Sequence, residues 1–324
     1  MRKRGFSPQQ VVFCLFSVLL ITTSAAKTEL YGEANAFGQF QTNADGSAFQ
    51  LAGYLSEFGF RNEEAVSESM KAHFDVRFSY SAMDTWYLFT RHGAVGLSGQ
   101  HGRLDYFFGE SPLAATNDYL RLMNQDPDAL SSAFNSTAAS ALGLPVGLGA
   151  VDGIWYRSPK VSDHWYFDAA LVPAEVIGGE TGLSFAGHFE DGQTKASLAF
   201  EINVETPNSQ LLRVIGQRQF EQVQLGLGLQ ASSRSDTDSA SRSYFAFAYV
   251  PVTLGAVDTR AKALMSLNQV TDTNQNQTSQ LYLSIVDEYP LSSRISLYGF
   301  GELELTNDLQ DATSYIGAGL RMVF

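Results

Sequence analysis

The stretch KASLAFEINVE, residues 195–205, alternates apolar and polar side chains over the length of a β-strand. Every second residue from Ala196 to Val204 is apolar, and a period of two places this set on one face of a strand. Residues 71–80 and the stretch VQLGLGLQ, residues 223–230, repeat the pattern. In a soluble β-sandwich the apolar face would form the core, whereas in a membrane barrel it would face lipid.

Runs of this kind follow one another along the whole chain. We count about sixteen, an even number that lets a sheet close without a free edge. They begin near residues 28, 47, 69, 85, 102, 150, 164, 181, 193, 210, 221, 242, 258, 278, 293 and 313. The pattern predicts an all-β protein, a transmembrane antiparallel β-barrel of 16 strands.

The connections between the runs alternate in length, which is typical of such barrels. Tight connections are expected at Gly99–Gly102, Pro159–Asp163, Asp191–Gly192, Gln219–Phe220 and Tyr289–Ser292. Longer ones are expected on the other side, at Glu110–Gly149, Ser232–Ser241, Thr271–Gln277 and Thr306–Ala312. The segment 110–149 is about forty residues without alternation, and loops of that length usually carry function. We predict that it folds back into the barrel and narrows a water-filled pore.

The N-terminus has the order of a secretory signal peptide. Basic residues at positions 2–4 precede an apolar run of 11 residues, Val11–Ile21, and then the small residues 24–26. Residues 1–26 are therefore predicted to be removed, which leaves 27–324 as a single domain. The net charge falls from −13 to −16, because the signal holds three basic and no acidic residues. Such an acidic chain is not expected to bind nucleic acid.

Several short motifs resemble the general, trimeric porins of Gram-negative outer membranes, closest to the neisserial type. Each motif is weak, but their order and spacing along the chain are similar to the family. The motifs are Leu30-Tyr31-Gly32, Phe58-Gly59-Phe60, Thr90-Arg91 with Gly96-Leu97, Tyr156-Arg157-Ser158-Pro159, and the C-terminal Phe324 behind alternating apolar residues.

The resemblance implies an outer-membrane location and passive diffusion of small hydrophilic solutes and ions. In this family, basic residues of one wall face acids of the inward loop and sort solutes by charge. Arg91 and Arg61 match basic positions of the family, Arg77 completes the candidate basic wall, and the candidate loop acids are Asp118, Asp126 and Asp128. The resemblance also implies a homotrimer in contact with outer-membrane lipid, and a Phe324 signal read by the barrel-insertion machinery.

The departures from the family concern charge. Glu33 and Glu57 stand where relatives have basic residues, Gly149 stands where an arginine is expected, and Asp75 adds a further wall acid. We therefore predict a pore that prefers cations. The connection at Ser81–Thr85 is too short to latch a neighbouring subunit, so a trimer would form through apolar packing of the first and last strands.

No enzyme, metal or cofactor is predicted. The five histidines lack metal-ligand spacing, and no serine motif accompanies them. The main alternative is a substrate-selective channel of the same fold for a sugar, organic acid or peptide. Such a channel would show an aromatic ladder in the lumen, with Tyr87, Phe89, Tyr298 and Phe300 as candidates. A plugged barrel that serves as an adhesin or scaffold is a third reading.

Overall fold

The computed structural model describes residues 28–52, 56–81, 87–119, 150–174, 179–254, 257–306 and 308–324. The predicted signal peptide and the acids Asp126 and Asp128 lie outside these ranges. Among the described residues, no helix is long and apolar enough to cross a membrane.

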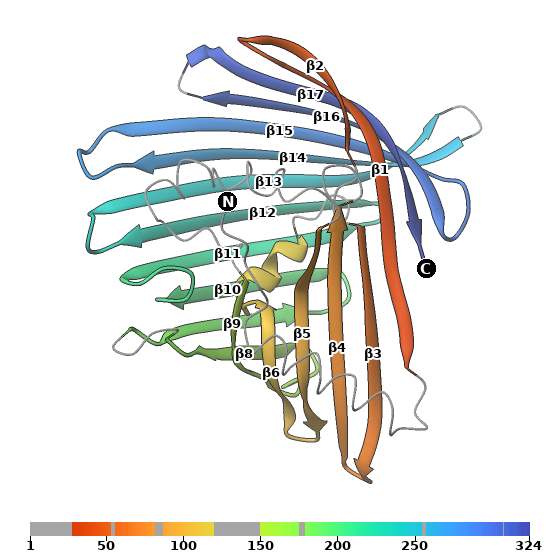
Figure 1. Cartoon of the computed structure of the whole chain (residues 1–324), viewed down its shortest axis with the longest axis vertical. Helices are drawn as coiled ribbons and strands as arrows, with labels where there is room; N and C mark the ends of the chain where they lie inside the picture. Colours follow the sequence, from red (N-terminus) through yellow and green to blue (C-terminus); the bar gives the residue numbers. More distant parts are fainter. Residues whose placement is uncertain are drawn as a thin grey trace.

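One antiparallel sheet contains all the described strands (Figure 1). They are β1 Glu29–Asn43, β2 Gly46–Ala52, β3 Ser56–Ser67, β4 Met70–Ser81, β5 Tyr87–Gly99, β6 Gly102–Glu110, β7 Ala150–Arg157, β8 Trp165–Val172, β9 Gly182–Glu190, β10 Thr194–Ile202, β11 Ser209–Phe220, β12 Val223–Arg234, β13 Ser239–Leu254, β14 Val257–Thr271, β15 Gln277–Pro290, β16 Ile295–Thr306 and β17 Asp308–Val323. A short 3-10 helix, η1 Ala114–Tyr119, follows β6.

The sheet closes on itself into a barrel of 16 strands. β2 pairs with the second half of β1, from Asn43↔Gly46, while β3 pairs with its first half, from Glu29↔Arg61. β2 and β3 therefore occupy the position of a single strand in the barrel, so the 17 segments of the sheet form 16 strands. β1 also pairs with β17 in register from Glu33↔Val323 to Thr42↔Ser314, which closes the ring. The predicted fold class is confirmed, and each expected run begins within a few residues of the first residue of a strand.

The last residue takes part in the closure. The backbone N–H of Phe324 donates to Gly32 O at 2.9 Å, and Gly32 N–H donates to Phe324 O at 3.0 Å. The aromatic ring lies against Gly32, where an added Cβ would be 2.8 Å from the ring's Cζ. Gly32 is needed at this position, because an added Cβ would also lie 2.3 Å from the backbone oxygen of Glu57. Both ends of the barrel sequence meet on the side that carries the tight turns.

Alternation assigns the two faces of the wall. The side chains of β10 that contact the segment 111–119, Ser197 and Glu201, are 3–4% exposed, while Leu198 and Phe200 between them are 52% and 40% exposed. The face toward η1 is the inward face. Leu225, Leu227 and Leu229 on β12 are likewise exposed on the outward face. Apolar side chains therefore cover the outside, which is the reverse of a soluble β-sandwich.

Two outer connections are shorter than the sequence predicted. The ladder between β12 and β13 continues through Ser232↔Ser241 to Arg234↔Ser239, and β17 already begins at Asp308. The prediction was wrong there because polar residues were taken as loop. Serine and arginine side chains are compatible with a ladder wherever both faces of the strand meet water.

Candidate pore lining and loop anchor

The acid Glu57 on β3 gathers two of the predicted wall arginines. Arg91 Nε lies 2.9 Å from Glu57 Oε1, and Arg77 Nη1 lies 3.8 Å from Glu57 Oε2. Arg91 Nη2 also reaches Glu110 Oε1 at 3.8 Å, at the point where the long connection begins. The arginines therefore neutralise acids of their own wall. In the family pattern they would instead face acids across the pore.

A β-bulge explains the position of Arg91. On β4, Arg77 pairs with His92 and the next residue, Phe78, pairs with Thr90, so Arg91 is the extra residue. A bulge reverses the alternation beyond it. His92 consequently lies on the same face as Arg91, and Leu97 faces outward with 45% of its surface exposed. The mixed pattern in this part of the sequence comes from this single inserted residue.

The other predicted wall residues also lie at inward positions. The hydroxyl of Tyr31 donates a short hydrogen bond to Asp75. Glu33 is buried and lies 3.2 Å from Arg321 Nη2, whose other nitrogen, Nη1, lies 3.5 Å from Glu288 Oε1. Arg61 pairs with Glu29 at 2.8 Å, but both side chains are more than half exposed. Arg61 thus makes a surface ion pair, and its guanidinium carbon lies 5.0 Å from the centroid of the Tyr31 ring.

The start of the long connection is fixed to the inward face of β9, β10 and β11. Leu113 is fully buried in a cluster with Ala186, Ala199 and Leu211. Its backbone N–H donates to Ser184 Oγ at 3.2 Å, and Ser111 donates a short hydrogen bond to Glu201. The chain therefore turns inward directly after β6 and contacts β9, β10 and β11.

Arg213 on β11 is the centre of this anchor. Its guanidinium is fully buried and Nη1 donates to Thr116 Oγ1 at 3.0 Å, Asn117 Oδ1 at 2.5 Å and Leu113 O at 3.3 Å. Nε donates to Gln230 Oε1 on β12 at 2.8 Å. A buried charge requires such a complete set of acceptors. The planar, five-donor guanidinium can bind the helical turn and the wall at the same time.

A second contact holds the other end of η1. The hydroxyls of Tyr119 and Ser197 lie 2.9 Å apart, and His188 Nδ1 lies 2.7 Å from Ser197 Oγ. His188 Nε2 is 3.2 Å from Asp168, which Arg157 binds with two nitrogens at 2.8 and 2.9 Å. Serine, histidine and aspartate are also the residues of hydrolytic triads. Here the serine is 4% exposed and engaged by Tyr119, so the group serves to position η1.

Sequence reasoning missed Arg213, Glu201 and Ser111. Arg213 stands between inward Leu211 and Ile215, so its strand lacks a uniformly polar inward face. Of the predicted loop acids, Asp118 is an exposed residue of η1. The structure places none of the three wall arginines in an ion pair with it. Glu110, at the end of β6, is the loop-side acid that meets Arg91.

An apolar cluster occupies another part of the inward wall. Aromatic rings of β13 and β16 lie flat over glycines of the neighbouring strands, with which they pair directly. An added Cβ on Gly226 or Gly228 would lie 2.0 Å from the ring of Phe247 or Phe245. The cluster contains Phe37, Ile215, Phe245, Phe247, Leu264, Tyr282, Val286 and Tyr298, with Tyr119 and Phe300 packed against it. Of Tyr87 and Phe89, the structure describes the backbone and not the side chains.

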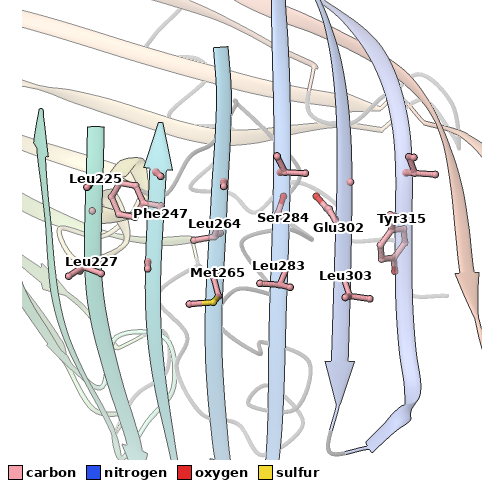
Figure 2. A pocket seen from close by; sticks show the side chains of 17 residues that line it. Leu225, Leu227, Phe247, Leu264, Met265, Leu283, Ser284, Glu302, Leu303 and Tyr315 are labelled. Atoms are coloured by element: carbon pink, nitrogen blue, oxygen red, sulfur yellow. The ribbon is translucent and has the colours of Figure 1, made fainter. Parts of the chain in front are cut away.

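A groove on the outward face lies over β12–β17 and has a volume of about 760 Å³ (Figure 2). It lies on the outer side of the wall and is separate from the pore lining.

Comparison with protein-family models finds no match, and comparison with curated proteins finds none. Solved porin structures do match over nearly the full length. An anion-selective porin from Comamonas acidovorans has a TM-score of 0.73 at 17% identity, covering 92% of this chain and 100% of that chain. Salmonella typhi OmpF, in complex with daunomycin, gives 0.71 at 13%, covering 92% and 98%. A mutant of Rh. blastica porin gives 0.61 at 11%, covering 92% and 100%. The chain therefore has the 16-strand barrel fold of bacterial porins.

Proposed function

We propose that this chain is an outer-membrane porin through which small hydrophilic solutes and ions diffuse passively. The observation that carries the proposal is the inverted surface of the closed barrel. Apolar side chains cover the outside, and the Glu57 group and the loop anchor lie inside. A barrel of 16 strands is wide enough to enclose an aqueous channel. No catalytic role is proposed.

The proposal is tested by reconstituting the purified mature chain into liposomes that contain a large dextran. A diffusion pore admits small sugars, so the liposomes swell at a rate that falls as the sugar becomes larger. A plugged barrel serving as an adhesin or scaffold would leave the liposomes unswollen. Absence of swelling with the smallest sugars would therefore refute the porin proposal.

Cation preference is part of the same proposal. Acids outnumber bases in the mature sequence, and Arg77, Arg91 and Arg321 are each paired with a carboxylate on the wall. Paired arginines contribute little net positive potential to a permeating ion. The zero-current potential in a salt gradient should have the sign of a cation-preferring pore. A potential of the opposite sign would refute the preference and leave the porin proposal intact.

The inward aromatic cluster favours a second candidate, a channel selective for one class of solute such as a sugar, organic acid or peptide. Tyr298 belongs to it and Phe300 packs against it, as an aromatic ladder would require. A selective channel would show current block at micromolar solute, whereas a general porin would remain ohmic.

Assembly as a homotrimer and recognition of Phe324 by the insertion machinery are proposed from the family pattern. Crosslinking in outer-membrane vesicles tests the trimer. Replacement of Phe324 by alanine, followed by measurement of the amount of folded protein in the membrane, tests the signal.

A further inference from the structure

The outward groove has a floor of small residues between apolar ridges. Each contributing strand supplies outward side chains and the backbone of the inward residue between them, which is why Phe247, Ser284 and Glu302 border it. The floor is formed by Ala246, Ala248, Ala263 and Gly301, and the ridges by Leu225, Leu227, Met265, Leu283, Ile285, Leu303 and Ile316. Figure 2 labels five of the ridge residues, Leu225, Leu227, Met265, Leu283 and Leu303. None of these outward side chains is polar, so the groove suits a hydrocarbon chain.

The groove has the size of a ligand site. Its volume of about 760 Å³ falls within the range of roughly 300–1,000 Å³ typical of pockets that hold small molecules. The ridge residues stand well clear of the floor, with Leu227 70% and Ile285 56% exposed. A concave channel of this kind matches a flexible chain better than it matches the convex wall of a second barrel.

A cation stands beside one edge of the groove. Arg218 on β11 is the direct cross-strand neighbour of Leu225, and alternation places it on the outward face. It is exposed and lies 5.5 Å from the ring centroid of Phe220. Asp191, the nearby acid, is already engaged, because its Oδ1 accepts the backbone N–H groups of Gln193 and Thr194.

The height of Arg218 matches a lipid headgroup. It lies two residues before the end of β11, on the side of the barrel that carries the tight turns and Phe324. Strand ends of a membrane barrel lie at the level of the headgroups. Arginine binds phosphate oxygens with two parallel hydrogen bonds.

We propose that the groove holds an acyl chain of a glycerophospholipid whose phosphate is bound by Arg218. The inference rests on the proposed membrane location. It adds a specific lipid site to the outer wall, formed by the groove floor and one arginine. An apolar groove and an adjacent exposed cation together match an anionic amphiphile. The groove without Arg218, or Arg218 without the groove, would not distinguish such a lipid from bulk hydrocarbon.

The test is native mass spectrometry of the mature chain in detergent with dioleoylphosphatidylglycerol as the probe. The wild type should retain one lipid per chain. Arg218→Gln removes the charge and should weaken binding about tenfold or more, since it breaks the charged hydrogen bonds to the phosphate. Ala248→Phe fills the floor and should also weaken binding, because the acyl chain loses its place in the groove. Ala169→Phe adds the same bulk to the outward face of β8, away from the groove, and should bind as the wild type does.

Heat-dependent mobility on gels establishes that each variant is folded. Equal lipid retention by the wild type, Ala248→Phe and Arg218→Gln would overturn the proposal. So would displacement of the phospholipid by lipopolysaccharide, or a wild-type oligomer that carries no lipid and dissociates in Ala248→Phe. Conductance in planar bilayers should be the same in all variants, since the groove lies outside the lumen. Loss of conductance in every variant would refute the proposed function, and the lipid count could still be read.

Discussion

Arg91 Nε lies 2.9 Å from Glu57 Oε1, which joins the extra residue of the β5 bulge to β3, across the intervening β4. Glu57 also lies 3.8 Å from Arg77 and accepts a hydrogen bond from Ser79 at 3.2 Å. One carboxylate thereby compensates two cations on this wall. Its removal should expose more positive charge than any other single substitution in this group.

Replacing Glu57 with glutamine should shift ion preference toward anions. The amide is nearly isosteric, so Arg91 and Arg77 remain in place while their shared counter-charge is lost. The zero-current potential in a salt gradient measures the shift. Glu63→Gln is the matched control, because Glu63 makes an exposed pair with Lys71 at the end of the barrel. An equal shift in both variants would show that Glu57 has no special place in the pore.

Replacing Arg213 with alanine should release the start of the long connection and destabilise the barrel. Asn117, Thr116 and Gln230 would all lose their buried donor. Leaving a buried acceptor without its donor costs about 1–3 kcal/mol for each group. We expect a lower unfolding temperature and noisier single-channel current. Arg61→Ala should cost less than about 1 kcal/mol, since its ion pair is exposed. A quiet, unchanged current in Arg213→Ala would contradict the anchoring role.

Replacing Gly228 with alanine should destabilise the barrel, and the same substitution should cost less in a Phe245→Ala background, where the ring that it meets is absent. The new Cβ would meet the Phe245 ring at 2.0 Å. Overpacking of this kind costs roughly 1–3 kcal/mol. Gly187→Ala is the control, because the nearest atom to its added Cβ is 3.9 Å away. Thermal unfolding in detergent gives all four values. Additive effects of Gly228→Ala and Phe245→Ala would show that the two residues do not interact.

The turn between β14 and β15 should loosen in acid. Hydrogen bonds from the side chain and backbone of Asn276, and from the backbone of Asn274, lower the pKa of Asp272 below its usual value. The Asp272 carboxylate therefore orders the turn fully when the pH is above its ordinary pKa. This ordering is lost as the pH falls through the lowered pKa. Amide exchange at Asn274 and Asn276 should accelerate in that range. Asp272→Ala should exchange quickly already at neutral pH, and slow exchange in that variant would contradict the assignment.

Alternation was sufficient to predict the barrel, because a strand with lipid on one side and water on the other must show a period of two. The starts of β10 and β12 follow directly from the runs around residues 195 and 223. The tight turn at Gly99–Gly102 was also predicted, and Gly102 has a φ of 108°, which favours glycine.

The candidate site was predicted less completely. Arg77 and Arg91 were named, and so was Glu57 as an acid that replaces a cation, but its pairing with both arginines was not predicted. The anchor at Arg213 could not be predicted, since it depends on where a loop one hundred residues earlier returns to the wall. Single-sequence periodicity reports which face a residue occupies. It does not report which distant segment reaches that face.

The most direct test of the account is the reactivity of cysteines at two adjacent positions of β16. Glu302 is at an inward position and Leu303 at an outward one. With Cys14, the only cysteine of the sequence, replaced by serine, Glu302→Cys and Leu303→Cys can be compared in planar bilayers. A charged, water-soluble thiol reagent should reduce the current through Glu302→Cys and leave Leu303→Cys unchanged. Reaction at Leu303→Cys with no effect at Glu302→Cys would show that the barrel wall has the opposite orientation.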